Sequence, residues 1–456
     1  MTRRPKLLIS VFLGMTYRNL IGSNLLSRIS ESFDVTLVTS DLNPALIETL
    51  RQSGTTLRVL KTTPQDSFRS KILGVLELAQ YLSFYDRVGT ETMQKYVKQI
   101  RSAWTTKRIF AEALVLFASS LPPGKFFEKP YLWFARKRLN EVLSGMDAAF
   151  VLSTDGVWDK ALTLAANRKG IPVMQLVHSW DNLPARGYLT GKTSKLLVWN
   201  ERMKAEAQSL HSKRAENIDV IGVPQYERYL QAASGLTRES FLKSLGLPFD
   251  GKFVTYTCSA FRVFPDEDLF IERLHEISLK LGVTLVIRLH PTERKDFYIQ
   301  KYSNPSRPGL IIDIPSGEFA ASSHSFSTGD GNGVARFVGL MKFSSAVLNL
   351  ASTITLDALL FDTPVICPAF NLDPKMDGAW NEASKWFESS HFKPIAVSGA
   401  TSIVKSASEL ESALKESIES PSQLGKKRAD LIEKFSPFQG KSHDQIVKSL
   451  QSGMKL

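Results

Sequence analysis

Short apolar runs alternate with helix-like amphipathic stretches along most of this 456-residue sequence. Runs of this length are typical of strands buried on both faces, and a helix between successive strands makes neighbouring strands parallel. The alternation therefore predicts an α/β fold of doubly wound parallel sheets with helices on both faces. The chain is too long for one small core, and its length fits two such domains.

The predicted strands fall into two sets. In the first half they are Leu7–Leu13, Val35–Thr39, Thr56–Leu60, Ala148–Leu152, Val173–Val177, Leu196–Trp199 and Asp219–Ile221. In the second half they are Phe253–Cys258, Thr284–Leu289, Leu310–Ile314, Ala346–Leu350 and Pro364–Pro368. Ligands of open α/β sheets bind at the carboxyl ends of the strands, so we expect two facing doubly wound domains that share one cleft.

The boundary between the domains is predicted around residues 230–252, where the periodicity breaks and glycine and proline gather. We expect a first domain at 1–235, a second at 250–430 and a helical tail at 431–456. Strand signals are scarce between about 68 and 145, which predicts a helical insertion in the first domain.

Composition excludes several classes of protein. Hydrophobic residues at 43% and charged residues at 22% are near globular averages, so the chain is neither disordered nor fibrous. Two cysteines, Cys258 and Cys367, exclude a disulfide scaffold and favour a reducing cytoplasm. No apolar run is long enough for a spanning helix. The basic and apolar N-terminus predicts a first strand rather than a signal peptide.

The charge balance predicts a phosphate-bearing partner, because the sequence has 57 Lys and Arg residues but only 45 Asp and Glu residues, a net charge of +12. We expect no nucleic acid partner, since no zinc finger, RRM-like aromatic motif or extended basic helix is evident. Between 68 and 145, basic residues such as Lys107-Arg108 and Arg136-Lys137-Arg138 interleave with Trp and Phe. This pattern favours peripheral contact with an anionic membrane. A solvated helix face is the alternative.

The segment His178-Ser179-Trp180-Asp181-Asn182 follows the predicted strand Val173–Val177 directly. Its side chains can transfer protons or hold phosphate, so His178 and Asp181 are candidate catalytic residues. Asp155 follows the preceding strand and is a third candidate for the base. The alternative is a pair of turns with a structural histidine, because Asp and Asn favour turns.

A second histidine lies near the end of a strand in the other domain. Arg288 and His290 are two residues apart on a strand and share one face, and Pro291 ends the strand. Arg suits bidentate phosphate contact, and a protonated His adds charge beside a leaving diphosphate. We predict that both contact the donor and that His290 is also catalytic. The alternative is a solvent-facing Arg with a capped His.

Ser352, Thr353 and Thr355 lie where the strand Ala346–Leu350 leads into a helix. Helix N-termini attract phosphate, and hydroxyl groups add hydrogen-bond donors, so we predict a donor-phosphate site there. An ordinary N-cap is the alternative. Asp266-Glu267-Asp268 is predicted to be a helix start rather than a metal motif, and Gly329–Gly333 a flexible loop. No metal site is expected, because the His and Cys residues lack ligand spacing.

The order of these segments resembles bacterial surface-polysaccharide glycosyltransferases of the GT-B fold. It is also similar to the CDP-glycerol glycerophosphotransferases of teichoic acid synthesis. The resemblance spans roughly Ala148 to Pro368 and rests on His178–Asn182, Leu197–Lys204, Ile221–Tyr226, Arg288–Pro291 and Ser352–Ala358.

The resemblance implies two Rossmann-like domains, of which the second mainly holds an activated donor and the first holds the acceptor. His178 and His290 match the two histidines of the phosphotransferases, and Ser352, Thr353 and Thr355 match their hydroxyl-rich turn. Those enzymes have Gly-Thr after the first histidine, where this chain has Ser-Trp-Asp-Asn, which favours sugar transfer. The implied activity is metal-independent transfer of a sugar, without a separate cofactor, from a nucleotide-sugar donor to a glycan or lipid-linked acceptor.

Several other functions share this architecture. One is CDP-glycerol-type glycerophosphotransfer, a second is nucleotide-sugar 2-epimerisation, and a third is a non-catalytic nucleotide-sugar-binding partner in a polysaccharide assembly. The lack of a dinucleotide glycine fingerprint after the first strand argues against an NAD enzyme. We expect the protein in the cytoplasm, either free or peripheral on the inner face of the cytoplasmic membrane.

Overall fold

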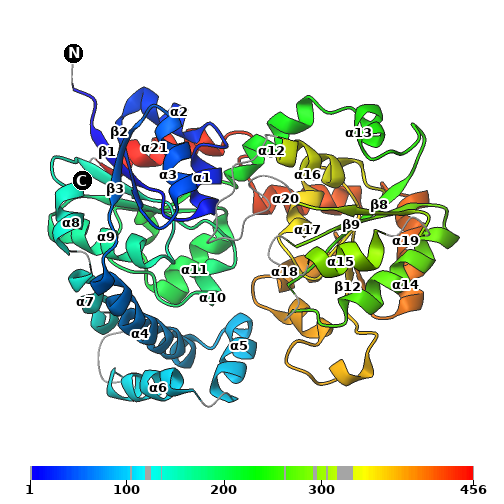
Figure 1. Ribbon diagram of the computed structural model, residues 1–456, viewed down its shortest axis with the longest axis horizontal. Helices are drawn as coiled ribbons and strands as arrows, with labels where there is room; N and C mark the ends of the chain where they lie inside the picture. The colour runs from blue at the N-terminus through cyan, green and yellow to red at the C-terminus, as the bar shows by residue number, and fades with distance from the viewer. Residues whose placement is uncertain are drawn as a thin grey trace. The chain divides into compact units, whose positions relative to one another are not determined.

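The structure is a computed structural model that describes residues 3–454 except 103–104, 119–124, 135, 261–262, 291–294, 304–306 and 316–331. The chain divides into two compact units (Figure 1). Unit 1 contains Met1–Glu227 and Phe435–Leu456, and unit 2 contains the described residues from Arg228 to Lys434. Each unit is built on a parallel sheet with helices, which confirms the predicted fold class.

Unit 1 contains a seven-stranded sheet in the order β3-β2-β1-β4-β5-β6-β7, and all its paired strands are parallel. Its strands are β1 (Lys6–Ser10), β2 (Asp34–Ser40), β3 (Thr56–Leu60), β4 (Ala148–Val151), β5 (Val173–Leu176), β6 (Lys195–Val198) and β7 (Ile218–Val220). Every residue of β4 and β5 is buried, as expected for strands covered on both faces. All seven strands coincide with predicted ones.

Alternate residues of β1 enter two different cores. Leu7 and Ile9 lie in one cluster with buried residues of the helices within 14–52. Leu8 lies in another cluster with buried residues of the helices within 64–88 and 125–168. The helices are α1 (Gly14–Leu20), α2 (Leu25–Ser32), α3 (Pro44–Gln52), α9 (Val157–Arg168), α10 (Asn182–Ala185) and α11 (Glu201–His211). The sheet is therefore covered on both faces.

The region between β3 and β4 is helical, as predicted. It contains α4 (Pro64–Val88), α5 (Glu91–Ser102), α6 (Thr106–Ala118), α7 (Lys125–Trp133) and α8 (Arg136–Val142). Thr63 caps α4 and forms a reciprocal capping box with Asp66. Buried side chains of α4, α5 and α6 form a small core of their own. The start of α4, with α7 and α8, therefore packs on the sheet, whereas the end of α4 packs with α5 and α6 in a separate core.

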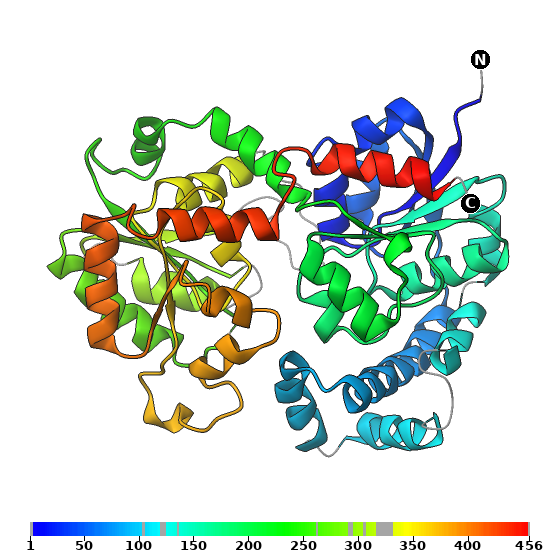
Figure 2. The same ribbon diagram turned by 180° about the vertical axis from the view of Figure 1, so that it is seen from behind.

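The last helix, α21 (Ser442–Gly453), packs in unit 1. Its Ile446 and Leu450 lie in the same core cluster as Leu7 and Ile9 of β1. Figure 2 shows this helix in red beside the dark-blue N-terminal elements. Arg28 of α2 donates to Asp444 at 2.9 Å, which adds a surface ion pair to the apolar contact. The chain therefore returns to unit 1 after unit 2, and its last helix packs against the first sheet.

Unit 2 contains a six-stranded parallel sheet in the order β10-β9-β8-β11-β12-β13. Its strands are β8 (Phe253–Thr257), β9 (Thr284–Arg288), β10 (Leu310–Asp313), β11 (Val347–Leu348), β12 (Val365–Pro368) and β13 (Ser402–Val404). The first five match the predicted set. The edge strand β13 was not predicted, because a run as short as Ser402–Val404 gives no clear apolar signal.

The helices of unit 2 lie before β8, between the strands of the sheet and after β13. They are α12 (Gln225–Ser234), α13 (Arg238–Ser244), α14 (Glu267–Lys280), α15 (Lys295–Tyr302), α16 (Asn332–Phe343), α17 (Ile354–Leu359), α18 (Lys393–Ala396), α19 (Ala407–Glu419) and α20 (Gly425–Phe435). Within the described ranges, no helix is long and apolar enough to cross a membrane.

Candidate functional site

The polar segments predicted in the first domain lie at the carboxyl ends of β4 and β5. These strands are neighbours, and their register pairs Val151 with Gln175. Asp155 follows β4, and His178 follows β5. The strand order reverses between β1 and β4, and open α/β sheets bind ligands at such a reversal. The fold therefore places these side chains at the edge where a ligand is expected.

Asp155 is the centre of a polar cluster at this edge. Its Oδ2 accepts a hydrogen bond from Asn182 Nδ2 at 3.3 Å and lies 3.9 Å from His178 Nε2. Arg186 Nε lies 3.8 Å from the same oxygen. Asn182 Nδ2 is also 3.3 Å from His178 Nε2, so it lies between the two candidate groups. The structure thus brings together Asp155 and His178, two of the predicted catalytic residues.

The protonation state of this cluster follows from its burial. Burial lowers the pKa of His178, and the negative charges of Asp155 and Asp181 offset that effect only in part. His178 is therefore neutral at pH 7. The Asp155 side chain is 25% exposed, so a ligand can reach its carboxylate. A neutral imidazole beside a reachable carboxylate can accept, hold and return a proton.

Asp181, the remaining predicted candidate, lies on the same loop with different partners. The Ser179 hydroxyl donates to Asp181 Oδ1. Glu206 of α11 is close enough for Asp181 to raise its pKa, although burial is the main cause of the shift to about 7. Arg202 opposes the shift through an ion pair of 2.9 Å with Glu206. Asp181 is thus beside a second, unpredicted acid rather than at the centre of the cluster.

Asp159 in the first turn of α9 is another acid that the sequence did not single out. Its side chain is 1% exposed, and Ser10 Oγ donates to its Oδ1 at 2.6 Å. Burial raises the pKa of Asp159 to about 7 despite this bond. A Cβ added at Gly156 would lie 2.6 Å from Asp159 Oδ2. Asp159 therefore supports the loop that carries Asp155. Only its position, four residues after Asp155, could have pointed to it.

In unit 2, Arg288 is buried and ion-paired within the sheet. It is 5% exposed and forms an ion pair with Asp313, its register partner on β10. Arg336 Nε donates to Asp313 at 2.7 Å, and the Arg288 guanidinium lies 5.1 Å from the centre of the Phe337 ring. The alternative of a solvent-facing Arg288 is wrong, because the Arg288 side chain is buried. Its predicted phosphate contact stays a prediction that must compete with this ion pair.

The hydroxyl-rich turn after β11 separates into two parts. Thr355 is fully buried, and its hydroxyl donates to Asn349 Oδ1 at 2.9 Å. Asn349 Oδ1 also accepts from the Ser352 amide at 3.0 Å, so Asn349 and Thr355 brace the turn. Ser352 and Thr353 are partly exposed at its outer side. Of the three predicted hydroxyl groups, these two are placed where a ligand can reach them.

His290 is the remaining predicted residue of unit 2. It lies two residues after the end of β9 and is partly exposed, and the residues that follow it, 291–294, lie outside the described ranges. The predicted Gly329–Gly333 loop overlaps the undescribed residues 316–331. Among the described residues, no group of three or more His, Cys, Asp or Glu side chains could hold a metal ion.

Asp266 does not cap α14, although it lies at the N-cap position. Its carboxylate instead accepts from Asn371 Nδ2 at 2.7 Å and from the amides of Leu372 and Asp373 at 2.8 and 3.1 Å. The predicted helix start is confirmed, because Asp266 is the N-cap residue of α14, but its side chain makes no capping hydrogen bond. Asp266 binds the loop after β12 to the start of α14.

Glu267, the next residue, is a buried acid that sequence reasoning missed. It accepts from Tyr256 and Tyr298 hydroxyls at 2.8 Å each and from the Ser259 amide at 2.6 Å. Burial raises the pKa of Glu267 to about 7, although these hydrogen bonds oppose the shift. Because Ser259 follows β8, Glu267 positions the loop at the carboxyl edge of the second sheet.

The raised pKa of Glu267 predicts a pH effect on stability. Between the unfolded value of 4.5 and the folded value of about 7, the folded state binds more protons, so the free energy of unfolding falls as pH rises. Glu267→Gln is expected to reduce that fall by about 1–3 kcal/mol. Urea unfolding at both ends of the range measures it. The exposed Glu276→Gln is the control, and an unchanged slope in Glu267→Gln would contradict the assignment.

Comparison with solved structures shows the same architecture along nearly the whole chain. UDP-GlcNAc 2-epimerase from Neisseria meningitidis bound to UDP-GlcNAc aligns over 98% of this chain and 99% of its own, with a TM-score of 0.58 and 14% identity. UDP-GlcNAc 2-epimerase from Methanocaldococcus jannaschii aligns over 98% and 99%, with a TM-score of 0.54 and 15% identity. A structure described as a glycosyltransferase from Rickettsia africae aligns over 99% of both chains, with a TM-score of 0.53 and 12% identity.

No protein family matches the sequence, and no curated protein is similar to it at a significant level. The resemblance to CDP-glycerol glycerophosphotransferases receives no support from these comparisons. At such low identities, structural likeness establishes the fold and leaves the activity to be tested. The chain has the two-domain GT-B fold that UDP-GlcNAc 2-epimerases share with the Rickettsia africae glycosyltransferase.

Proposed function

We propose that this chain is an enzyme that acts on a nucleotide sugar and inverts its configuration at C2. The observation that carries the proposal is the alignment of both units, over 98% of the chain, with an epimerase structure bound to UDP-GlcNAc. The resemblance seen in the sequence favoured sugar transfer, with 2-epimerisation as one alternative. The structural likeness supports that alternative better.

The polar cluster of unit 1 suits proton transfer at a sugar carbon. Inversion at C2 breaks the C–H bond on one face of the ring and forms a new one on the other, so the enzyme must accept a proton and return one. Asp155 is assigned the proton-accepting role, because its carboxylate can be reached by a ligand and lies beside the His178 imidazole and the Arg186 guanidinium. His178 and Asp181 are the candidates for returning the proton. Neutral His178 would do so only after it has been protonated.

The turn after β11 and the end of β9 in unit 2 suit the phosphates of the nucleotide. The partly exposed Ser352 and Thr353 can donate hydrogen bonds to phosphate oxygens, and His290 can offset their charge. Arg288 is assigned a supporting role through Asp313, because its guanidinium is already ion-paired. Buried Thr355 is assigned the role of holding the turn in shape.

Glycosyl transfer is the second candidate. It is supported by the likeness to the Rickettsia africae glycosyltransferase and by the segment His178–Asn182. In that reaction the acceptor hydroxyl loses its proton to Asp155, Asp181 or His178, and the nucleoside diphosphate leaves from the anomeric carbon. The same side chains serve both reactions, and only the fate of the C2 hydrogen separates them.

Incubation with UDP-GlcNAc in D₂O, without any acceptor, tests the proposal. An epimerase is expected to produce the C2 epimer and to place deuterium at C2, which NMR detects. Release of UDP without deuterium at C2, and only when an acceptor is added, would instead indicate a transferase. Thermal stabilisation by the nucleotide sugar without any turnover would indicate a non-catalytic binding partner.

The identity of the nucleotide is tested by thermal shift. UDP-, GDP-, CDP- and dTDP-sugars and CMP-linked acid sugars are compared at equal concentration, because a ligand that binds only the folded state raises the melting temperature more the tighter it binds. The proposal expects the largest shift with a UDP-sugar. The sugar that gives it is then used in the D₂O experiment.

A further inference from the structure

A pocket of about 760 Å³ lies in the helical insertion of unit 1, among the first two turns of α4, helices α7 and α8, and the C-terminal end of α9. Six basic side chains line it, and no acidic side chain does so among the described residues. They are Arg69, Lys129, Arg136, Lys137, Arg138 and Arg168. A concave surface with charges of one sign focuses the field and favours an anionic ligand.

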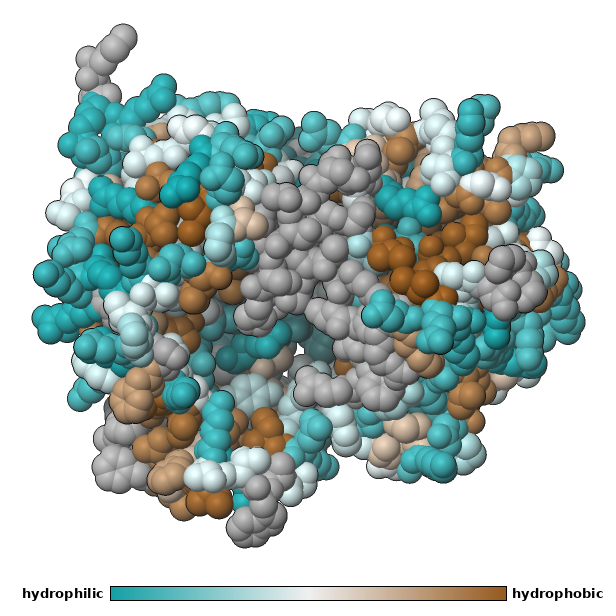
Figure 3. Space-filling view, in the orientation of Figure 1, coloured by the Kyte–Doolittle hydropathy of each residue, from teal (hydrophilic) through white to brown (hydrophobic). Residues whose placement is uncertain are grey.

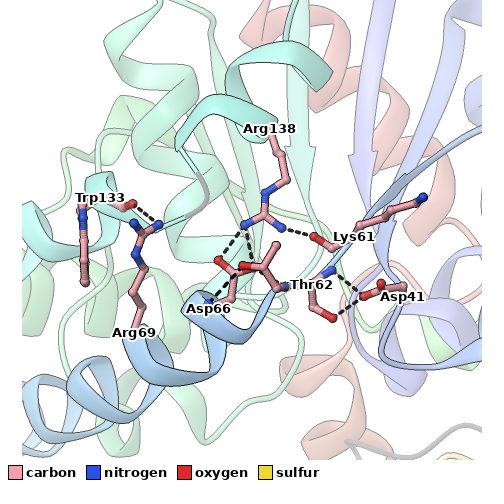
Figure 4. Close-up of polar contacts among 8 residues, drawn as sticks. Asp41, Lys61, Thr62, Asp66, Arg69, Trp133 and Arg138 are labelled. Atoms are coloured by element: carbon pink, nitrogen blue, oxygen red, sulfur yellow. Dashed lines mark hydrogen bonds and ion pairs between the residues drawn. The ribbon is translucent and has the colours of Figure 1, made fainter.

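The basic side chains of the pocket divide into a structural one and a set that faces solvent. Arg138 forms an ion pair of 2.7 Å with buried Asp66 and also donates to the Lys61 carbonyl (Figure 4). Burial raises the pKa of Asp66, but hydrogen bonds from Arg138 and Thr63 outweigh it and hold that pKa below its usual value. Arg138 therefore joins α8 to the start of α4.

The other basic residues leave their charge for a ligand. Among the described residues, no ion pair connects Arg69, Lys129, Arg136, Lys137 or Arg168 to a carboxylate. Arg69 lies 4.1 Å from the centre of the Trp133 ring, which fixes its guanidinium over an aromatic face (Figure 4). The four remaining side chains are exposed. Phosphate groups are the anions that such a set of Arg and Lys side chains binds best.

Exposed apolar side chains lie next to these charges. Trp133, which lines the pocket, is 46% exposed, and Phe68 and Ile72 of α4 are 64% and 39% exposed. Phe68, Arg69 and Ile72 have the spacing of one helix face. On the face drawn in Figure 3, brown and teal residues lie together over the insertion. A soluble anion would need the cations alone, whereas a lipid surface uses both cations and exposed apolar side chains.

We propose that this pocket, with the adjacent apolar face of α4, binds the phosphate headgroup of an anionic phospholipid at a membrane surface. The basic residues contact headgroup phosphates, while Phe68, Ile72 and Trp133 enter the interfacial layer. This interaction goes beyond the proposed activity, because the nucleotide-sugar roles are assigned to other residues. It accounts for part of the surplus of +12 that the catalytic edges do not use.

Vesicle sedimentation with the full chain tests the proposal. The chain is expected to bind vesicles of equal parts phosphatidylcholine and phosphatidylglycerol, to ignore phosphatidylcholine alone, and to dissociate as salt is raised. The variant Arg136→Gln with Lys137→Gln keeps the structural Arg138 and is expected to bind about 25-fold more weakly. The factor follows from about fivefold per basic residue near an anionic surface.

The matched control is Lys426→Gln with Lys427→Gln, two adjacent exposed residues of α20 in unit 2 that remove the same charge. It is expected to bind as the unchanged chain does. Equal weakening in both variants would overturn the assignment to the pocket, because net charge alone would then explain binding.

Two further outcomes would overturn the choice of a lipid. One is no vesicle binding together with thermal stabilisation by inorganic phosphate or glycerol phosphate, which would make the ligand soluble. The other is an unchanged vesicle affinity in the variant Phe68→Gln, which substitutes an exposed side chain of α4. That result would show that the apolar side chain does not contribute to binding. Melting temperatures of all variants confirm that each is folded.

Discussion

Substituting Asp155 by Asn is expected to lower kcat by about 10²–10⁴-fold on the nucleotide sugar that the chain turns over. A positioned acid or base contributes a factor of this size, and an amide cannot take up the proton. Asn keeps the size of the side chain and an oxygen that can accept from Asn182. The loss should therefore appear in kcat, measured from initial rates at saturating substrate, with little change in melting temperature.

Asp34→Asn is the control for this experiment. Asp34 begins β2, is exposed, and lies at the amino end of its strand, away from the carboxyl edge where Asp155 lies. Its substitution is expected to leave kcat unchanged. If Asp155→Asn retained full turnover while His178→Gln or Asp181→Asn lost it, Asp155 would not be the base. The proton-transfer role would then move to the loop after β5.

Much of the fold could be predicted from the sequence, because parallel strands buried on both faces leave a strong apolar signal. Twelve strands were predicted, and β1 to β12 lie where those runs are. The helix start predicted at Asp266–Asp268 is observed, with α14 at Glu267–Lys280. The edge strand β13 was missed, since its three residues stand between polar neighbours and are recruited by pairing with β12.

The candidate site could be predicted only as far as strand ends allow. Asp155 and His178 follow strands that the sequence identifies, and adjacent parallel strands place such residues together. The partner of Arg288 could not be found in this way, because Asp313 becomes its neighbour through the register of β9 with β10. Thr355 was likewise counted as a phosphate ligand, although it turns inward to Asn349.

Buried acids were the main omission. Asp159, Glu206 and Glu267 each have a pKa raised to about 7 by burial. In the sequence they are ordinary helix residues, and acids near a helix start are expected on the surface. Their burial depends on packing against distant residues, such as Ser10 for Asp159 and Tyr298 for Glu267. No local pattern carries that information.

Substituting Asp313 by Asn is expected to destabilise unit 2 by about 3–5 kcal/mol. Removal of one partner from a buried ion pair leaves the other charge without compensation, and that loss is of this size. Asp313 is 3% exposed and binds two arginines, Arg288 and Arg336. The amide cannot neutralise either guanidinium. Urea unfolding of the full chain, followed by circular dichroism, measures the change in the free energy of unfolding.

Asp268→Asn in the same unit is the matched control. Its ion pair of 3.2 Å with Lys301 is about one-third exposed, so the expected loss is below about 1 kcal/mol. If Asp313→Asn cost no more than this control, the Arg288 guanidinium would have to reach water or another acceptor without Asp313. Arg288 would then be available to donor phosphates, and its assignment would return from support of the sheet to direct contact with the nucleotide.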